Sequence, residues 1–438
     1  MLSIDGPPPR CGMEAATWPS LRRGSTPLPP LKSRSRIILD MWSRGGRRVL
    51  SLQRRRLCGQ APSTAVRHEF DIDALKLYLL KQSQIRDAET MFENMSVSEF
   101  SHGQSNPTYI IKTNVGSQKK FVLRKQPPGA LLRGAHAVDR EHRVMSELGR
   151  LGAPVPQTLL FCEDSSVLGT PFFMYEFVNG RFYKDPVLPD PSHNIQDRKE
   201  MMASMAGALA KIHSVHIALV PGLHTYGRPT GYIMRQIKTW SAQYELSKTV
   251  DIPEMDQVME WLPAAIPDTN DGDHVFLVHG DFRMDNLLYN QDDNEVAAVL
   301  DWELSTLSDT PLGDLAYNCM MYHLTPRDAS ITGFKGLDYV GAGIPSEEEY
   351  LDIYARALRE HSGGRISLDP HQTHTFFLSF SFFRAAAILQ GVYKRSLDGN
   401  AAAPNASIMG DMAIEMAEKS WYFANKYDAR TQGVKTYI

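Results

Sequence analysis

The hydrophobic pattern predicts strands on both sides of a polar loop in the second half of the chain. Residues 275–278 form a short apolar run, residues 279–286 are mostly polar, and two further apolar runs flank a turn at 290–294. Apolar runs of this length, bounded by turn residues, are typical of buried strands. The loop at 279–286 and residues 301–303, which follow the last run, should therefore lie close together.

The first part of the chain has mainly the pattern of strands. A first helix should begin at Asp71 or Asp73, and another helix is predicted at 135–149. The strands are predicted at 108–112, 120–125, 159–162 and 171–178.

After residue 190 the pattern is mainly helical. Asp309 is expected to cap one of these helices, and the Gly-rich segment 335–345 is expected to be a mobile loop. The stretch 376–389 is too short and too polar to span a bilayer, so we predict a buried helix and no transmembrane segment. The helices are predicted at 201–213, 233–244, 255–266, 308–317, 346–360, 370–394 and 409–426.

Composition and charge narrow the class of protein. The chain has 438 residues, 42% of them hydrophobic, which is enough for one two-lobed domain or two domains. Residues 1–67 carry 13 Lys and Arg against 3 Asp and Glu, a net +10, so the remainder carries −13 of the overall −3. This acidic remainder argues against nucleic acid as the main partner. The four cysteines lack metal-ligand spacing and indicate reduced thiols in a non-secretory compartment.

The basic leader has the composition of a targeting segment. Residues 1–40 are rich in Pro, Gly, Ser and Arg and are expected to be disordered. From Met41 onward, apolar residues alternate with arginines and acids are almost missing, which is typical of mitochondrial targeting. A basic tail that contacts acidic surfaces is the alternative. We expect a matrix location, or otherwise a cytoplasmic or peroxisomal one, and Met41 is a plausible start. Folded lobes are expected at 68–178 and 179–438.

Three side chains of the central region have the chemistry of phosphoryl transfer. Asp281 and Asn286 lie in the polar loop, and Asp301 follows the last strand. Such a reaction needs one carboxylate to accept the hydroxyl proton, while an amide and a second carboxylate hold Mg²⁺ on the nucleotide phosphates. An Asp and an Asn four residues apart also occur by chance in turns. The added His279-Gly280 and the distal Asp301 make chance the weaker explanation.

A turn upstream of the first strands is a candidate phosphate loop. It contains Ser101, Gly103, Ser105 and Asn106, followed by Pro107. Backbone N–H groups of such a turn can bind phosphate oxygens. An ordinary hairpin would have the same residues.

Basic and acidic groups near the predicted cleft complete a nucleotide site. Alternation along the strand 120–125 lets only one of Arg124 and Lys125 face the cleft, and we expect Arg124. Glu141 on the next helix could hold Arg124 by an ion pair. Backbone groups from Glu176 to Val178 lie where an inter-lobe hinge would contact adenine.

Two further charged residues lie in apolar helices. Asp314, between leucines, is expected to brace the backbone of the loop at 279–286 rather than to act chemically. Arg384 needs an anion or a carboxylate partner in so apolar a helix. It could contact an anionic acceptor or pair with a core acid.

These residues resemble a known family. His279-Gly280-Asp281 with Asn286 and the run 300–303 resemble the aminoglycoside phosphotransferase and choline kinase-like family, over about residues 95–430. The resemblance is closer to the kinase-like domain fused to certain large eukaryotic acyl-CoA dehydrogenases. The runs that carry it are 103–109, 122–125, 139–141, 279–283 and 386–393.

The resemblance implies a fold, an activity and site residues. It implies an α+β, protein kinase-like fold, with a small β-rich N-lobe and a larger helical C-lobe. It also implies ATP and Mg²⁺ as cofactors, Asp281 as catalytic base, and Asn286 and Asp301 as Mg²⁺ ligands. Arg124 stands where many relatives have Lys, although choline kinase-like members also use Arg there.

The acceptor implied by the resemblance is a hydroxylated acyl chain, free or as a coenzyme A thioester, in fatty-acid breakdown. Candidate acceptor contacts are Arg283, Glu303, Arg384, Gln390 and Tyr393. Two alternatives stay open. One is a non-catalytic module that binds nucleotide or acyl-CoA as the partner of an acyl-CoA dehydrogenase. The other is a choline or aminoglycoside kinase, which would need an acid-rich acceptor pocket.

Overall fold

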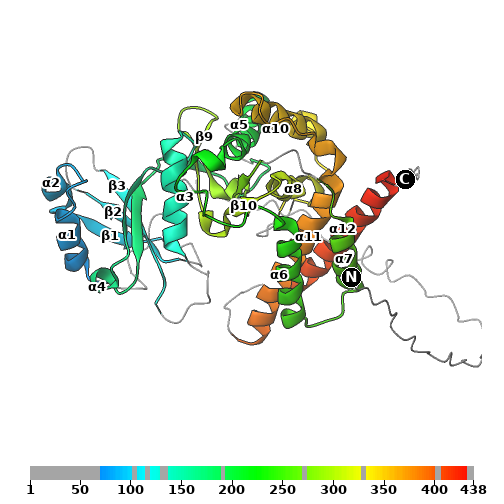
Figure 1. Ribbon diagram of the computed structural model, residues 1–438, viewed down its shortest axis with the longest axis horizontal. Coiled ribbons are helices and arrows are strands. Elements are labelled where there is room, and N and C mark those ends of the chain that lie inside the picture. Colours follow the sequence, from blue (N-terminus) through cyan, green and yellow to red (C-terminus); the bar gives the residue numbers. More distant parts are fainter. Residues whose placement is uncertain are drawn as a thin grey trace, which may run out of the picture. The chain divides into compact units, whose positions relative to one another are not determined.

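The computed structural model in Figure 1 describes eight segments of the chain. All eight lie in the unit 58–438, one of the two units into which the chain divides. They are residues 70–100, 106–113, 119–128, 137–188, 193–268, 274–326, 332–399 and 406–431.

The first part is built on a five-stranded antiparallel sheet in the order β1-β2-β3-β5-β4. Alternation along β3 separates its side chains between two cores. Phe121 and Leu123 pack with the first helices, whereas Val122 packs on the other face with Val144. Arg124 is on the same face as Val122. The strands are β1 Ser96–Glu99, β2 Thr108–Lys112, β3 Lys120–Lys125, β4 Thr158–Cys162 and β5 Phe172–Glu176.

Helices cover both faces of this sheet (Figure 1). The Asp71 carboxylate accepts a hydrogen bond from the Ala74 amide at 2.9 Å and caps α1, one of the two N-caps that the sequence allowed. The helix α3 lies on the other face, as its apolar side predicts. These helices are α1 Ile72–Leu80, α2 Ala88–Phe92, α3 Val138–Arg150 and α4 Ser165–Leu168.

Two small sheets follow and hold the central polar loop. In one, β7 (Phe276–Val278) pairs with β10 (Thr306–Ser308). In the other, β8 (Leu287–Tyr289) lies between β6 (Arg181–Phe182) and β9 (Val296–Val299). The strands predicted around the loop are therefore confirmed.

The remaining described residues are mostly helical, which confirms the α+β prediction. Capping boxes begin α5 and α10, with Asn194 paired to Asp197 and Ser346 paired to Glu349. The α-helices are α5 Ile195–His213, α6 Tyr232–Ser247, α7 Pro253–Ala265, α8 Leu312–Cys319, α9 Tyr339–Ala342, α10 Glu347–His361, α11 His374–Leu397 and α12 Ala406–Thr431. The short 3-10 helices are η2 Ile217–Leu219, η3 Met284–Asn286, η4 Trp302–Leu304, η5 Met320–His323 and η6 Pro370–Gln372.

The helix α11 is the centre of this helical part. In the described part of the chain it alone has the length and composition to cross a membrane, but 83% of its most apolar window is buried. Packed helices surround such a stretch in place of lipid. The prediction of a buried core helix is confirmed, but the expectation that the stretch is too short and too polar to span a bilayer is wrong, because the helix extends beyond residues 376–389.

Two local predictions are wrong. Asp309 does not cap α8, because Pro311 stands at the N-cap and the Asp309 carboxylate instead accepts a hydrogen bond from the Gly231 amide at 2.6 Å. The segment 335–345 is not only loop, since it contains α9, which Asp338 caps. In the first place a distant amide, which the local sequence does not indicate, is the partner of the Asp, and in the second the Asp begins a short helix.

The helices α11 and α12 approach closely through two small residues. The Ser379 and Ser420 hydroxyls each donate to the other's backbone carbonyl, at 2.8 and 2.7 Å, and both side chains are fully buried. We expect Ser420→Leu to lower the free energy of unfolding by about 2 kcal/mol or more, because extra carbons must enter a packed contact. Ser420→Ala, which loses only the hydrogen bonds, should cost about 1 kcal/mol. Urea unfolding followed by circular dichroism compares the two variants, and equal midpoints would contradict close packing at this position.

Candidate active site

The loop after β7 is held in one shape by a glycine and a buried carboxylate. Gly280 has φ +85°, and a side chain there would place a Cβ 2.6 Å from the Leu304 carbonyl oxygen. The two carboxylate oxygens of Asp314 accept hydrogen bonds from the His279 and Gly280 amides, at 2.5 and 2.9 Å. Asp314 therefore braces the loop backbone, as the sequence predicted.

Asp314 is itself fixed from the opposite side. The His213 ring lies 3.4 Å from its Oδ2 and 2.8 Å from the Tyr354 hydroxyl. Burial alone would raise the pKa of Asp314, but the hydrogen bond and charge of His213 and the Gly280 amide outweigh burial and lower this pKa. The carboxylate stays charged at neutral pH, so it remains a hydrogen-bond acceptor.

His279 joins the two polar segments of the site. Its Nδ1 accepts a hydrogen bond from the Asp281 amide at 3.1 Å, so its Nε2 carries the proton and donates to the Leu300 carbonyl at 2.9 Å. The ring is fully buried and packs on Trp302. His279 thus ties the backbone of Asp281 to the residue before Asp301.

The structure brings together Asp281, Asn286 and Asp301. The Asn286 side-chain nitrogen donates to the Asp281 carbonyl at 2.8 Å and to the Asp281 Oδ2 at 3.1 Å. The Leu300 amide donates to the Asn286 carbonyl at 2.9 Å, which places Asp301 next to them. Asp301 has φ +66°, a left-handed conformation that redirects the chain as it leaves β9.

Arg124 connects the first sheet to this loop. Its Nε lies 2.9 Å from Glu141 Oε2, and its Nη2 lies 2.8 Å from Asp301 Oδ1 and 3.8 Å from Glu303 Oε2. Burial would lower the pKa of Arg124, but Glu141 and Asp301 outweigh it and raise this pKa. Burial raises the pKa of Glu141 to about 7, and Arg124 opposes that rise. Arg124 on β3 and Glu141 on α3 therefore form the expected ion pair, and Glu303 lies beside this pair.

The other predicted nucleotide contacts are only partly described. Asn106 is buried, and its carbonyl accepts from the Thr108 hydroxyl at 2.9 Å. At the expected hinge, the Glu176 amide donates to the Gln157 carbonyl and the Phe177 amide to the Lys120 carbonyl. Ser101, Gly103 and Ser105 lie outside the described residues.

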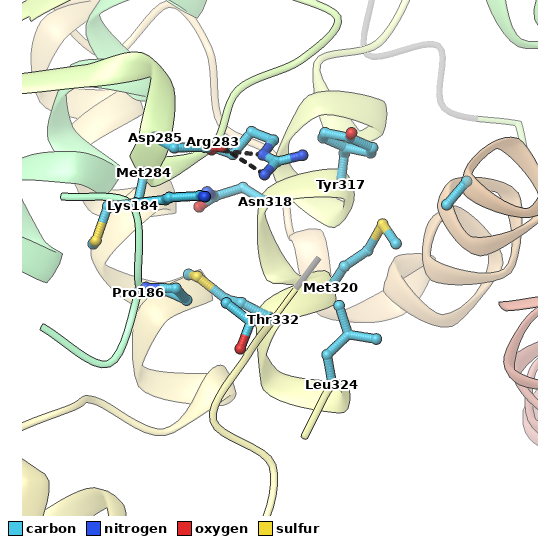
Figure 2. Close-up of a pocket in the computed structure, with 12 residues that line it drawn as sticks. Lys184, Pro186, Arg283, Met284, Asp285, Tyr317, Asn318, Met320, Leu324 and Thr332 are labelled. Atoms are coloured by element: carbon cyan, nitrogen blue, oxygen red, sulfur yellow. Dashed lines mark hydrogen bonds and ion pairs between the residues drawn. The ribbon is translucent and has the colours of Figure 1, made fainter. Parts of the chain in front are cut away.

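A pocket that is open to solvent adjoins the loop (Figure 2). Polar groups from Lys184, Arg283 and Asp285 lie on one part of its wall. The apolar part of the wall is formed by Pro186, Met284, Met320, Met321, Leu324 and Ala385.

Arg283 and Tyr317 join this pocket to Asp281. The Arg283 guanidinium makes two hydrogen bonds of 2.6 Å to Asp285, drawn as dashed lines in Figure 2. Burial raises the pKa of Tyr317, and the nearby charge of Asp281 raises it further. Tyr317 and Lys184 were not predicted as site residues. The position of Tyr317 one turn after Asp314 on a helix could have indicated Tyr317, but no local signal points to Lys184.

The remaining acceptor candidates separate into two groups. Arg384 is buried, its guanidinium stacks 4.9 Å from the Tyr317 ring, and its Nε has no hydrogen-bond partner in the described structure. Gln390 instead donates to the Ser247 carbonyl and to Thr249, and neither Gln390 nor Tyr393 lines the pocket. The structure brings only Arg384 of these three close to the pocket wall.

Comparison with known proteins identifies the family. The signature of the phosphotransferase enzyme family matches residues 96–350, more than half of the chain. The chain belongs to this phosphotransferase family. Its members are small-molecule kinases that transfer a phosphoryl group from a nucleoside triphosphate, held with a divalent metal, to a hydroxyl.

Individual relatives agree with this family. Acyl-CoA dehydrogenase family member 10 of Mus musculus is 44% identical over 334 residues, which are 76% of this phosphotransferase and 29% of that relative. The chain spans less than half the length of the acyl-CoA dehydrogenase relatives that it matches.

Solved structures agree as well. A Ralstonia eutropha JMP134 protein with a provisional assignment as an aminoglycoside phosphotransferase is 38% identical, with a TM-score of 0.68, and covers 82% of this chain and 99% of that one. Choline kinase from Cryptosporidium parvum Iowa II is 12% identical, with a TM-score of 0.56 over 83% and 98% of the two chains. The second likeness concerns the fold alone, and it confirms the kinase-like expectation.

The loop of the phosphotransferase fits a nucleotide-bound divalent cation. The Asp301 side chain is 36% exposed, so its carboxylate is accessible. The side-chain nitrogen of Asn286 is hydrogen-bonded to Asp281. The side-chain oxygen of Asn286 is therefore the atom that can coordinate a cation. Carboxylate and amide oxygens are the donors that hard cations such as Mg²⁺ prefer.

Removal of the Asp314 charge should loosen the catalytic loop of the phosphotransferase. We expect Asp314→Asn to lower the free energy of unfolding at neutral pH by about 2 kcal/mol, the size of losing hydrogen bonds to a buried charge. Because the pKa of Asp314 is lowered from 3.8, its contribution is present above that value and is lost as pH falls toward the lowered pKa. The stability gap between wild type and variant should therefore shrink on acidification.

Urea unfolding from about pH 7 to pH 3 measures this gap. Asp292→Asn, in the exposed turn between β8 and β9, is the control and should show little gap at any pH. A gap for Asp314→Asn that is constant across the series would contradict the role of the charge.

Proposed function

We propose that the phosphotransferase uses ATP and Mg²⁺ to phosphorylate a hydroxyl of an anionic acceptor with an apolar chain. A hydroxyacyl compound, either free or as a coenzyme A thioester, has this chemistry. The wall of the pocket beside the loop carries the proposal. It is largely apolar, it holds the cations Lys184 and Arg283, and the one carboxylate among its described lining residues, Asp285, is already paired with Arg283.

The buried Arg384 supports an anionic acceptor. No ion pair between Arg384 and a carboxylate is found in the described part of the chain, and the guanidinium is held between the rings of Trp240 and Tyr317. A buried cation without a carboxylate favours an incoming anion. A cationic acceptor such as choline would instead need unpaired acids. The names of the curated relatives, acyl-CoA dehydrogenases, support acyl chemistry in the same direction.

Asp281 is the group that would accept the proton of the acceptor hydroxyl. Asn286 holds one of its carboxylate oxygens, and the Tyr317 hydroxyl, kept protonated by its raised pKa, lies near the carboxylate. These contacts fix the direction of the carboxylate before an acceptor arrives. General-base catalysis of this kind contributes about 10²- to 10⁴-fold to the rate.

Arg124, Asn286 and Asp301 would handle the charge of the nucleotide. Arg124 is fixed to Glu141, and its Nη2, which is paired with Asp301, would be the group that binds a phosphate oxygen. Asn286 and Asp301 would hold the Mg²⁺, which when bound neutralises the phosphate charge. Because the Glu176 and Phe177 amides are used within the sheet, Val178 is the next amide that could contact adenine.

An acceptor screen tests the proposed function. ADP release is measured with 3-, 4- and 5-hydroxyacyl compounds, free and coenzyme A-linked, beside choline, ethanolamine and an aminoglycoside. We expect turnover with hydroxyacyl compounds only. Comparable turnover of choline would refute the anionic acceptor. Nucleotide binding without any turnover would favour a non-catalytic partner of a dehydrogenase.

Substitution of the two aspartates should separate chemistry from nucleotide binding. Asp281→Asn keeps an acceptor oxygen for Asn286, so we expect Mg²⁺-ATP affinity to stay within about twofold while kcat falls about 10²-fold or more. Asp301→Ala should instead weaken Mg²⁺-dependent ATP binding. Calorimetry and steady-state kinetics measure the two effects, with Asp292→Ala as control. Full activity of Asp281→Asn would remove the assigned base.

The charge of Lys184 should act on acceptor binding alone. We expect Lys184→Met to raise the KM of a hydroxyacyl acceptor by about 10-fold, as for the loss of a hydrogen bond to a charged group, and to leave the KM of ATP unchanged. Lys335→Met removes an exposed lysine that does not line the pocket and serves as the matched control. Equal kinetics for the two variants would show that Lys184 does not contact the acceptor.

A further inference from the structure

A second cluster of reactive side chains lies where four elements meet, apart from the pocket and the catalytic loop. Cys319 ends α8, His323 ends η5, Glu347 begins α10 and His374 begins α11. In the phosphoryl-transfer chemistry described above these four side chains have no part. Among the described residues, the donor atoms of Cys319, Glu347 and His374 form a group within 4.8 Å of one another.

The Glu347 carboxylate is the centre of the cluster. One oxygen, Oε1, lies 2.8 Å from the Nε2 of His323 and also 2.8 Å from the Nε2 of His374. Two imidazoles from different helices therefore converge on a single oxygen atom. The sulfur of Cys319 lies beside this arrangement, and the structure gives its thiol no hydrogen bond in the described part of the chain.

The cluster is partly shielded from water. Cys319 has no exposed surface and the His374 side chain is 9% exposed, whereas the side chains of Glu347 and His323 are 23% and 22% exposed. Burial would raise the pKa of Glu347, but hydrogen bonds from His323 and His374 outweigh it and lower this pKa to about 2. Burial and the Glu347 charge raise the pKa of the Cys319 thiol. The Glu347 carboxylate, held by two imidazoles, thus lies next to a buried thiol.

We propose that Cys319, Glu347 and His374 bind one divalent transition-metal ion of the zinc class, and that His323, which lies outside this group of three but is hydrogen-bonded to Glu347, would turn to become the fourth ligand. Sulfur, imidazole nitrogen and a carboxylate oxygen are the donors that Zn²⁺ takes, and four is its usual number in structural sites. Mg²⁺ and Ca²⁺ prefer oxygen donors only, so the active-site cation would not compete.

Binding would release one proton from the Cys319 thiol. The histidines would coordinate through Nε2, so the proton that each Nε2 donates to Glu347 would move to Nδ1 and the rings would stay neutral. The ion would replace the two hydrogen bonds to Glu347 with bonds to metal. The alternative is a cluster held by those two hydrogen bonds alone, with a buried thiol as packing.

An ion at this position would connect the catalytic machinery to the helical core. The helix α8 carries Asp314, which braces the loop, and Tyr317, which contacts Asp281. The ion would fix the end of α8 to the first turns of α10 and α11. Its role would be structural, so its presence is measured by spectroscopy and stability rather than by turnover.

Cobalt(II) titration of the full chain tests the site. The protein carries no affinity tag, is stripped with chelator and is kept reduced. We expect one Co²⁺ per chain, a sulfur-to-cobalt charge-transfer band and the strong visible bands of a four-coordinate ion. One equivalent of Zn²⁺ should abolish these bands and raise the Tm, whereas excess Mg²⁺ should do neither.

Two cysteine variants assign the sulfur. Cys319→Ser should lose the charge-transfer band, and Cys162→Ser, a buried free cysteine in β4, should keep it. No band in the wild type, or the same band in Cys319→Ser, would overturn the proposal.

If circular dichroism shows that Cys319→Ser does not fold, the variant His374→Gln tests the proposal instead. This variant should keep the charge-transfer band but bind Co²⁺ at least about 10- to 100-fold more weakly. Replacing a residue that only hydrogen-bonds to a metal ligand already weakens metal binding by this factor. Unchanged affinity in His374→Gln would also overturn the proposal.

Discussion

The shape of the catalytic loop depends on one buried carboxylate. Asp314 accepts from two consecutive amides, and the bend between them is possible only because Gly280 has no side chain. An uncompensated buried charge would be costly, but His213 and the two amides stabilise the ionised form. The loop therefore does not rely on its own short sequence for its conformation. It is held from α8, which is packed against the core helix α11.

A second constraint runs between the strands. His279 uses both ring nitrogens, one for the Asp281 amide and one for the Leu300 carbonyl, so the loop and the end of β9 cannot move independently. Asn286 adds a link from its side chain to Asp281. The proposed base and the proposed metal ligands thus share one hydrogen-bonded frame, and preorganisation of this kind is what phosphoryl transfer requires.

The sequence predicted local order well and distant packing poorly. Three features were predicted from the spacing of apolar residues, the alternation of side chains along a strand and the expected burial of polar groups. They are the strands around the loop, the Arg124–Glu141 pair and the contact of Asp314 with the loop backbone, and all three are present. Asp309 was assigned to the wrong amide, because a short acidic side chain near a turn can reach several partners. Lys184 on the pocket wall and the partners of Gln390 depend on contacts between segments far apart in the chain, which no local pattern encodes.

While Arg124 and Asp301 face each other at 2.8 Å, each already has a partner of opposite charge. A phosphate that arrives alone must leave Asp301 without its cation, and a metal ion that arrives alone must take Asp301 away from Arg124, whose close anion is then Glu141 alone. When both arrive, every charge is matched again. On the proposed roles, the free energies of metal and nucleotide binding are therefore linked with positive cooperativity, and by reciprocity each ligand tightens the other by the same factor.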